Sequence, residues 1–339
     1  MNNYSKRLIG VAGFRGYSGA ELVRILSRHP HVETILLEHR ADSEPQTGPL
    51  GRKIPKTIPA TAEAIAAEKL HLVFLATPAD VSLDLAPSIL ATGAKVIDLS
   101  GAFRLGDPET YSRWYRERHT APALFDKAVY GLPEFYRDRI RGAQLVANPG
   151  CYPTAANLAI KPLVKAQVAD RARGIICDAK SGVSGAGRKA SLKTSFCEVA
   201  ENLSIYGFND HRHVPEVLQN SGLGEREFTF TAQLLPINRG ILETIYLRTQ
   251  GVKSAVDLLS IYEECYADEP FIRLYPPGKV PDLRAVQGTN FCDIGFHFDA
   301  ESQRATIVAA EDNLVKGAAG QAVQNMNLML GFPETEALL

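Results

Sequence analysis

Short apolar runs alternate with amphipathic stretches along the first hundred residues, and this alternation restricts the fold more than any other feature of the sequence. The runs RLIGVAGF, VETILLEH, LHLVFLATP and AKVIDLSG are almost continuously apolar, as expected of strands buried on both faces. Between them, GAELVRILSRHP and VSLDLAPSILATG are typical of helices, the first ended by Pro30. Strands that alternate with helices predict a parallel sheet covered on both faces.

The pattern changes after residue 150 of the 339-residue chain. Strand-like runs follow one another more closely and several alternate between apolar and polar residues, which predicts a mixed or antiparallel sheet. The tail NLVKGAAGQAVQNMNLMLGF has helical spacing and ends at Gly331 and Pro333. We therefore predict an α/β protein with a parallel-sheet domain over 1–150, joined by a C-terminal helix over 313–339. A second, α+β domain with a mixed sheet would span 151–312.

Composition excludes several classes of partner. The formal net charge of −1 gives no electrostatic reason to expect nucleic acid or an anionic membrane surface, so a small-molecule substrate is favoured. No apolar stretch is long enough for a signal peptide or a membrane span. The five cysteines are scattered and form no C-x-x-C pair, so we expect neither a disulfide framework nor a zinc site. A cytoplasmic location and no metal are predicted.

A glycine-rich loop follows the first predicted strand and opens the first predicted helix. In GVAGFRGYSGAEL, glycines permit a tight turn and let the backbone approach a pyrophosphate, which the helix amino end would receive. The alternative is that the glycines serve only close helix–strand packing. Because the loop lies in the first strand–helix unit, we favour a dinucleotide. The predicted cofactor contacts in this loop are Gly13, Arg15, Gly16, Tyr17, Ser18 and Gly19.

The end of the second predicted strand bears on the choice of cofactor. An NAD enzyme usually places a carboxylate there for the ribose hydroxyl. This chain has Glu38, followed by Arg40 and Ser43. We predict that Arg40 and Ser43 bind a 2′-phosphate, so the cofactor is NADP(H). Glu38 is evidence for NAD instead, because it is a carboxylate at this strand end.

Cys151 stands in VANPGCYPTAAN, between a turn sequence and a predicted helix that begins near Pro153. A thiol at a helix amino end meets the positive end of the helix dipole, which stabilises the thiolate, and Gly150 leaves room for a substrate. The other cysteines lie within apolar patterns, where a cysteine is usually a small buried residue. They are Cys177, Cys197, Cys265 and Cys292.

A cysteine nucleophile needs an acid–base partner, and NDHRHVPE provides His211 and His213. In an extended segment these two side chains point to opposite sides, so only one is expected to face the thiol. A metal site is disfavoured because no third ligand stands at a suitable spacing. The other alternative, exposed loop histidines, remains open for either residue.

Several motifs together resemble the N-acetyl-γ-glutamyl-phosphate reductase family over nearly the whole chain. They are GFRGYSGAEL, VIDLSGAFRL, YGLPEFYRDRI, NPGCYPTA, KSGVSGAGRKA, HRHVPE, PINRGILETIY and DNLVKGAAGQAVQNMNLMLGF. The resemblance implies NADPH-dependent reduction of N-acetyl-γ-glutamyl phosphate to N-acetylglutamate 5-semialdehyde with release of inorganic phosphate, in arginine biosynthesis. It also implies that residues 1–150 form a Rossmann-type NAD(P)-binding domain, that 151–312 form the catalytic and oligomerisation domain, and that the protein is a homodimer or homotetramer.

The resemblance makes Cys151 the nucleophile that forms a thioester and makes His213, or else His211, the acid–base group. Phosphate and the substrate carboxylate need cations, and Arg104 and Arg239 are the candidates. A surface salt bridge is the alternative for each arginine. The remaining substrate candidates lie within the motifs of the resemblance and are Ser100, Asn148 and Glu216.

The loop SGVSGAG could lie against the nicotinamide or the acyl phosphate, unless it is an ordinary turn; we assign Ser181 and Gly182 to the cofactor. Asn313 is expected at the nicotinamide end. Two other functions remain as alternatives. One is a reductase of a carrier-linked aminoadipyl or glutamyl phosphate, and the other is a non-catalytic NADP(H) sensor. A cysteine hydrolase is disfavoured because it leaves the glycine loop unexplained.

Overall fold

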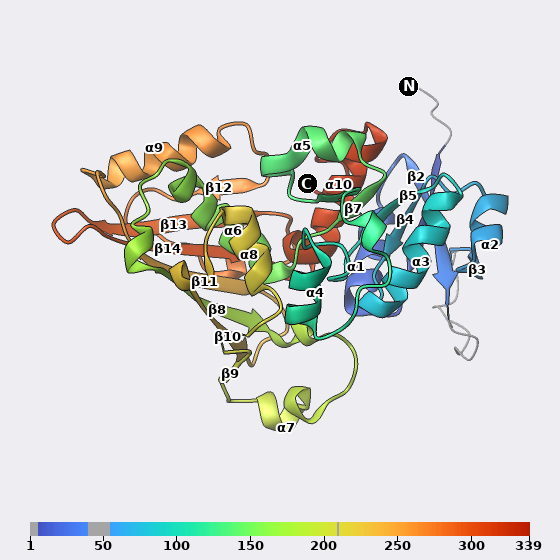
Figure 1. Cartoon of the computed structure of the whole chain (residues 1–339), viewed down its shortest axis with the longest axis horizontal. Helices are drawn as coiled ribbons and strands as arrows, with labels where there is room; N and C mark the ends of the chain where they lie inside the picture. Colours follow the sequence, from blue (N-terminus) through green and yellow to red (C-terminus); the bar gives the residue numbers. More distant parts are fainter. Residues whose placement is uncertain (1–5, 40–54, 209) are drawn as a thin grey trace. The chain divides into compact units, whose positions relative to one another are not determined.

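The computed structural model describes residues 6–39, 55–208 and 210–339, and its chain divides into two compact units. The first unit comprises Met1–Pro108, Arg118–Asn148 and Ala322–Leu339, and the second comprises Glu109–Glu117 and Pro149–Gln321 (Figure 1). The sequence placed the division after residue 150 and the return of the chain at residue 313. The structural units instead change at residues 149 and 322, and the assignment of a cofactor role and a catalytic role to the two parts stays a prediction.

The first unit is built around a parallel sheet. Within the described residues this sheet holds seven strands in the order β3-β2-β1-β4-β5-β7-β6, and every pair of neighbours runs parallel. The strands are β1 (Arg7–Ala12), β2 (Val32–Glu38), β3 (Thr57–Pro59), β4 (Leu72–Leu75), β5 (Lys95–Asp98), β6 (Ala128–Tyr130) and β7 (Leu145–Ala147). The order reverses beside β1, which is the point where open sheets of this kind bind ligands.

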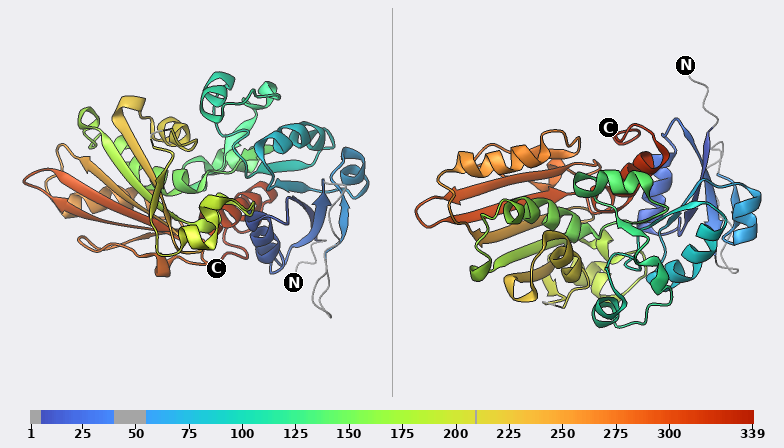
Figure 2. Two further views of the ribbon diagram at one scale, coloured as in Figure 1. Left: turned by 90° about the horizontal axis from the view of Figure 1, so that it is seen from below. Right: turned by 45° about the horizontal axis from the view of Figure 1, so that its top comes forward.

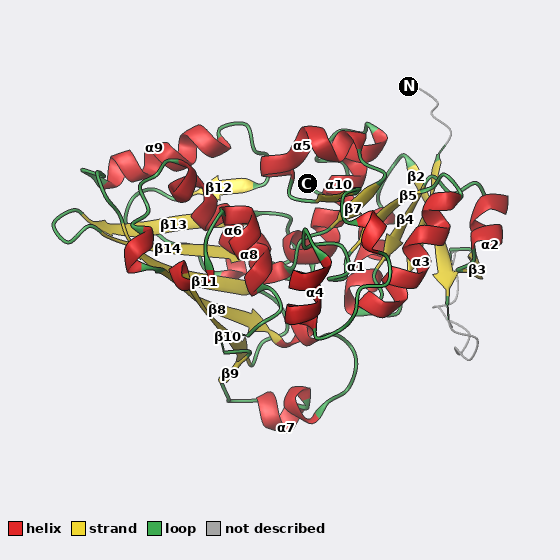
Figure 3. Cartoon of the chain, viewed as in Figure 1, coloured by secondary structure: helices red, strands yellow, loops and turns green. Residues whose placement is uncertain are grey.

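Helices alternate with these strands, as Figure 3 shows in red and yellow. They are α1 (Tyr17–Leu26), α2 (Ala62–Ala67), α3 (Ala79–Ala91), α5 (Pro133–Gly142) and α10 (Gly320–Leu330), with a short 3₁₀ turn η1 (Pro122–Leu124). The central strand β4 is buried at all four positions, because helices shield it from solvent on both faces. The predicted doubly wound parallel sheet is confirmed.

The second unit contains a mixed sheet. Its described strands follow the order β12-β13-β14-β11-β8-β10-β9, with β8/β10 and β12/β13 parallel and the other neighbours antiparallel. The strands are β8 (Ile175–Gly182), β9 (Ser204–Tyr206), β10 (Phe228–Leu235), β11 (Ile241–Arg248), β12 (Ile272–Leu274), β13 (Cys292–Asp299) and β14 (Arg304–Glu311). The mixed sheet predicted for this part of the chain is confirmed.

Helix α6 (Cys151–Lys165) forms the centre of the second unit. It packs on β11, β14 and helix α8 (Val214–Ser221), and most of its side chains are buried. Helix α9 (Ala255–Tyr266) lies along β13, as the orange helix beside the red-orange strands in Figures 1 and 2. Tyr262 and Tyr266 of α9 donate hydrogen bonds of 2.6 Å to main-chain carbonyls of α6. These bonds tie the middle of α6 to α9.

Three helical segments of the second unit are shorter or less regular. Helix α4 (Pro108–Tyr115) begins where the chain first enters this unit, and α7 (Phe196–Val199) lies in the loop between β8 and β9 (Figure 3). The predicted C-terminal helix has two parts, because a π-helix η7 (Val315–Ala319) precedes α10. The remaining 3₁₀ turns are η2 (Arg171–Arg173), η3 (Val183–Ala186), η4 (Leu192–Thr194), η5 (Glu225–Glu227) and η6 (Leu283–Ala285).

Among the described residues, no helix is both long enough and apolar enough to cross a membrane. Across the same part of the chain, no three His, Cys, Asp or Glu side chains are grouped so that they could hold a metal ion.

Candidate active site

Cys151 is the first residue of α6, two residues earlier than the predicted start of that helix. Gly150 is its N-cap in an extended conformation, and the Gly150 carbonyl accepts hydrogen bonds of 3.0 Å from the amide and the hydroxyl of Thr154. The Cys151 side chain is half-buried. The thiol therefore lies at the amino end of a long helix, whose dipole favours the thiolate.

Two glycines lie next to Cys151 at positions where a side chain would not fit. A β-carbon on Gly150 would lie 2.6 Å from Nε2 of His213. A β-carbon on Gly317 would lie 2.9 Å from Cβ of Cys151. Both distances are too short for a real contact, so glycine at these positions lets the His213 ring and the η7 backbone close on the cysteine.

The two histidines lie in a turn and both line the same cavity as Cys151. His213 has helical angles (φ −85°, ψ −14°) as the N-cap of α8, and the ring centroids of His211 and His213 are 4.8 Å apart. The expectation of an extended segment with opposed side chains is therefore wrong. In a helical turn, residues two apart do not alternate sides as they do in a strand.

The structure distinguishes the two imidazoles. Nδ1 of His211 accepts a hydrogen bond of 3.2 Å from the amide of His213. Burial, followed by the nearby Arg212 guanidinium, lowers the pKa of His211 to about 4, although Asp210 opposes the shift. His211 is therefore neutral at pH 7, with Nδ1 occupied as an acceptor.

Glu216 connects α8 to the start of α6. Its side chain is fully buried, and Oε2 accepts a hydrogen bond of 2.9 Å from the Gly150 amide. The predicted substrate-binding residue therefore contacts the backbone beside the cysteine. The carboxylate accepts from an amide at the helix start, which orients the Pro149–Gly150 peptide directly before the cysteine.

Tyr152 and Tyr206, which the sequence did not single out, form part of the same site. Their hydroxyls are 3.0 Å apart, and the Tyr152 ring contacts both histidine rings edge-on. Burial raises the pKa of Tyr206 to about 12 and raises the pKa of Tyr152 further. Both hydroxyls therefore stay protonated, and they act as hydrogen-bonding groups at neutral pH.

These residues face a cavity of about 650 Å³, here called the Cys151 cavity. Ser181 and Gly185 line it at the end of β8, and residues of the loop around α7 form another wall. That wall includes the charged residues Lys193 and Glu198, while Asp210 and Arg212 line the cavity beside the histidines. The volume is in the usual range for a small-molecule site.

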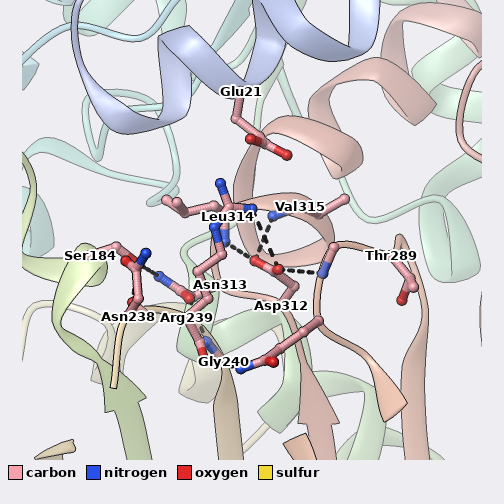
Figure 4. Close-up of polar contacts among 12 residues, drawn as sticks. Glu21, Ser184, Asn238, Arg239, Gly240, Thr289, Asp312, Asn313, Leu314 and Val315 are labelled. Carbon is pink, nitrogen blue, oxygen red and sulfur yellow. Dashed lines mark hydrogen bonds and ion pairs between the residues drawn. The ribbon is translucent and has the colours of Figure 1, made fainter. Parts of the chain in front are cut away.

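Asn313 lies between two loops of the second unit, as Figure 4 shows. Its Oδ1 accepts a hydrogen bond of 2.8 Å from the Gly240 amide, and its Nδ2 donates one of 2.9 Å to Oγ of Ser184. Gly182, predicted as a cofactor contact, pairs with the Gly240 carbonyl at 2.9 Å. Asn313 therefore joins the loop after β8 to the loop before β11.

Arg239, predicted to bind an anionic group of the substrate, has a carboxylate beside it (Figure 4). Its Nη1 is 3.6 Å from Oδ2 of the fully buried Asp312. The Asp312 carboxylate also accepts hydrogen bonds from the amides of Leu314 and Gly288. Arg239 does not line the Cys151 cavity.

The other three predicted substrate residues gather in the first unit, at the carboxyl ends of β5 and β7. The Arg104 guanidinium donates hydrogen bonds of 2.8 Å to the carbonyls of Asn148 and Leu99. Ser100 donates one of 2.8 Å to Asp98, a carboxyl group whose pKa burial raises despite its hydrogen bonds to serines. Oδ1 of Asn148 accepts one of 3.0 Å from Asn325.

The glycine loop of the first unit has the shape that a dinucleotide requires. Gly13 has φ +77°, and a β-carbon there would lie 2.2 Å from the Ala76 carbonyl. Gly16 is the N-cap of α1, and the first turn of that helix holds no acidic residue. The amino end of α1 follows the carboxyl end of β1 and can therefore receive a pyrophosphate.

The side chains predicted to bind the cofactor in this unit are only partly described. Arg15 forms an ion pair with Glu38, so the carboxylate that would otherwise favour NAD is engaged by a loop residue. Ser18 is half-buried and Tyr17 is 43% exposed. Arg40 and Ser43 lie outside the described residues.

The other cysteines differ in burial. Cys177 and Cys292 are buried and Cys265 is half-buried, whereas Cys197 is exposed. The expectation of a buried residue is wrong for Cys197, because it belongs to the four-residue helix α7, which is too short to bury a continuous apolar face.

Comparison with known proteins first defines a class. Residues 8–143 match the family model described as semialdehyde dehydrogenase, NAD binding domain, and residues 151–313 match semialdehyde dehydrogenase, dimerisation domain. Aspartate semialdehyde dehydrogenase II from Vibrio cholerae has the same fold, with a TM-score of 0.74 at 20% identity over 96% of this chain and 99% of that one. The Candida albicans enzyme, solved with NADP, has a TM-score of 0.67 at 16% identity, with the same two shares covered. Fold and site together define a semialdehyde dehydrogenase-type oxidoreductase.

The sequence comparison identifies the family within this class. N-acetyl-gamma-glutamyl-phosphate reductase of Symbiobacterium thermophilum is 46% identical over 98% of this chain and 97% of its own length. The same enzyme of Geobacillus thermodenitrificans is also 46% identical, over 97% of both chains. The chain belongs to the N-acetyl-γ-glutamyl-phosphate reductase family, and the resemblance seen in its motifs is confirmed.

Proposed function

We propose that this protein reduces N-acetyl-γ-glutamyl phosphate to N-acetylglutamate 5-semialdehyde with NADPH and releases phosphate. One observation carries the chemistry: Cys151 begins α6 beside the His213 ring, and both line a cavity that accommodates a small substrate. The relatives named for this activity match over nearly their full length. The activity is a step of arginine biosynthesis.

The site residues account for each step on the protein side. The Cys151 thiolate attacks the acyl carbon and expels phosphate, leaving a thioester, and His213 takes the thiol proton. NADPH, when bound, would supply the hydride that reduces the thioester carbon. His213 then returns a proton as the resulting thiohemiacetal breaks down, which frees the aldehyde and the thiol. Glu216 holds the Gly150 amide so that the cysteine keeps its orientation.

His213 is assigned the acid–base role in place of His211. Nε2 of His213 lies close to Gly150, the residue directly before the nucleophile. His211 is a weak base because burial lowers its pKa to about 4, and its Nδ1 already accepts a hydrogen bond from the His213 amide. In this proposal, His211 positions the His213 backbone.

The cofactor-binding unit is proposed to prefer NADP(H). The family model describes an NAD-binding domain without distinguishing the two dinucleotides. The ion pair with Arg15 offsets the charge of Glu38, and this reduces repulsion of a 2′-phosphate at the end of β2. Contacts of the nicotinamide end with Ser181, Gly182 and Asn313 belong to the same proposal.

The dimerisation domain match indicates an oligomer. A homodimer or homotetramer is the proposed assembly, and a cytoplasmic location remains a prediction from the sequence. Substrate contacts by Ser100, Arg104, Asn148 and Arg239 remain predictions as well.

The reaction is tested in reverse, because the semialdehyde is more stable than the acyl phosphate. N-acetylglutamate semialdehyde, phosphate and NADP should yield phosphate-dependent absorbance of NADPH. Cys151→Ala should lower kcat by roughly 10⁴-fold or more, as removal of a nucleophile does in other enzymes. NAD in place of NADP should give a lower kcat/KM.

Cys197→Ala is the matched control, because Cys197 is exposed and lies outside the Cys151 cavity. It should retain wild-type turnover. Undiminished activity of Cys151→Ala, or a folded wild-type protein that shows no turnover of this semialdehyde, would contradict the proposal.

A further inference from the structure

The proposed substrate carries a carboxylate as well as the acyl phosphate, and the two arginines predicted to hold these anions are engaged elsewhere. Arg239 has Asp312 at 3.6 Å, and Arg104 donates to two main-chain carbonyls of the first unit. Neither arginine lines the Cys151 cavity. The cavity therefore needs another source of positive charge if it is to accept a dianionic or trianionic substrate.

The cavity contains two other cations, Lys193 from η4 and Arg212 from the turn before α8. Among the described residues, neither side chain takes part in an ion pair or a side-chain hydrogen bond. Of the acidic residues on the same lining, Asp210 already has Arg116 at 3.4 Å, which leaves Glu198 as the opposing carboxylate. Two available cations thus face the space in front of the nucleophile.

The charge of Arg212 acts within this cavity. After burial, it is the largest cause of the lowered pKa of His211, and it also lowers the pKa of Tyr206 against the effect of burial. Arg212 directly precedes His213, the N-cap of α8, so its backbone is tied to the helix that orients the acid–base group. The geometry, with Lys193 on the neighbouring wall, suits an anion held away from the reacting carbon.

We infer that Lys193 and Arg212 form the subsite for the α-carboxylate of the substrate. This inference rests on the proposed function. An ammonium and a guanidinium on neighbouring walls of one cavity can hold a carboxylate by charge-assisted hydrogen bonds. The subsite would make the enzyme select acyl chains that carry a carboxylate over chains of the same length that lack it.

The test compares two aldehydes in the reverse reaction, N-acetylglutamate semialdehyde and acetamidobutanal, which has hydrogen in place of the α-carboxylate. Lys193→Ala and Arg212→Ala should each lower kcat/KM for the carboxylated aldehyde by roughly ten- to a hundredfold, the effect of one lost charge-assisted hydrogen bond. Activity toward acetamidobutanal should change little. Lys193→Arg and Arg212→Lys should restore part of the selectivity, because the charge is kept.

Lys253→Ala is the matched control, an exposed lysine of the same unit outside the cavity. An equal loss toward both aldehydes would show that the two cations support only the structure, and would overturn the inference. A raised KM for phosphate with unchanged selectivity between aldehydes would overturn it in favour of a phosphate subsite. The wild-type rate reports separately on the proposed function, since selectivity is read only from the ratio between the two aldehydes.

Discussion

Gly150 places the backbone of the nucleophile directly against an imidazole. Gly150→Ala would put a methyl group 2.6 Å from Nε2 of His213, where either the ring or the helix start must move. We expect destabilisation of about 1–3 kcal/mol, as for other overpacked sites. Turnover should fall by roughly a hundredfold, because a displacement of about 1 Å is enough to misalign reacting groups. Urea unfolding and the reverse assay measure the two effects.

Gly142→Ala provides a matched control. Gly142 ends α5, and a β-carbon there would meet no atom within 4 Å. The free energy of unfolding of this variant should lie within about 0.5 kcal/mol of the wild-type value, or slightly above it. Equal behaviour of the two alanine variants would contradict the role assigned to Gly150.

His211 should make stability depend on acidity. Its pKa is about 4 in the folded protein and 6.5 as a free side chain, so between these values the unfolded chain binds more protons than the folded one. The free energy of unfolding therefore falls as pH drops through this window, by at most about 1.4 kcal/mol per pH unit for one group. His211→Gln should flatten the fall. Urea titrations between pH 4 and 7 measure the slope.

His297→Gln is the companion variant, because His297 is exposed on β13. The difference in slope between the two variants isolates the effect of burial at His211. If both variants follow the wild-type profile, His211 is not held neutral by its surroundings.

At the level of secondary-structure elements, Asn313 connects two loops of the second unit. Its amide joins the loop after β8, which lines the cavity at Ser181 and Gly185, to the loop before β11. Asn313→Ala leaves the buried Gly240 amide without this acceptor, so we expect a loss of about 1–3 kcal/mol in the free energy of unfolding. The kcat/KM should fall by roughly ten- to a hundredfold, because the cavity wall shifts.

Ser184→Ala serves as the partial deletion for this connection. It removes the bond from Nδ2 of Asn313 and the bond of 2.7 Å that Oγ of Ser184 donates to the Asn238 carbonyl. The Gly240 amide keeps its acceptor, and the Asn238 carbonyl keeps the Ser184 amide as a donor at 3.1 Å, so both losses should be smaller. Urea unfolding and steady-state kinetics on the two variants test this order. A Ser184→Ala protein that is less stable or less active than the Asn313→Ala protein would contradict this order.

Elements with strong periodicity could be predicted from the sequence, and short ones could not. The long apolar runs around β1, β4 and β11 and the helix after Cys151 are present as expected. Strands of three residues, such as β6 and β9, contain too few positions to show an alternating pattern. The π-helix η7 was not predicted from the sequence; its Gly317 packs against Cys151, and a contact between residues so far apart leaves no local pattern.

At the scale of the whole molecule, the pattern of apolar and amphipathic runs was enough to predict a parallel-sheet unit and a mixed-sheet unit. Strand order could not be predicted, because pairing between distant segments leaves no local signal. The nucleophile could be found because a turn and a helix start flank it in sequence. Lys193 could not, because it comes from a loop more than forty residues away whose position depends on tertiary packing.

The division of the chain also has a consequence for its synthesis. Residues Ala322–Leu339 belong to the unit that contains β1, and Asn325 within them bonds to Gly131 and Asn148. During translation, all of Pro149–Gln321 is therefore synthesised before Asn325 can contact Gly131 and Asn148. Val323 and Met326, which are fully buried in the finished protein, are among the last residues of this unit to be synthesised. Although domains usually fold in the order of translation, the unit that emerges first here is the last to be completed.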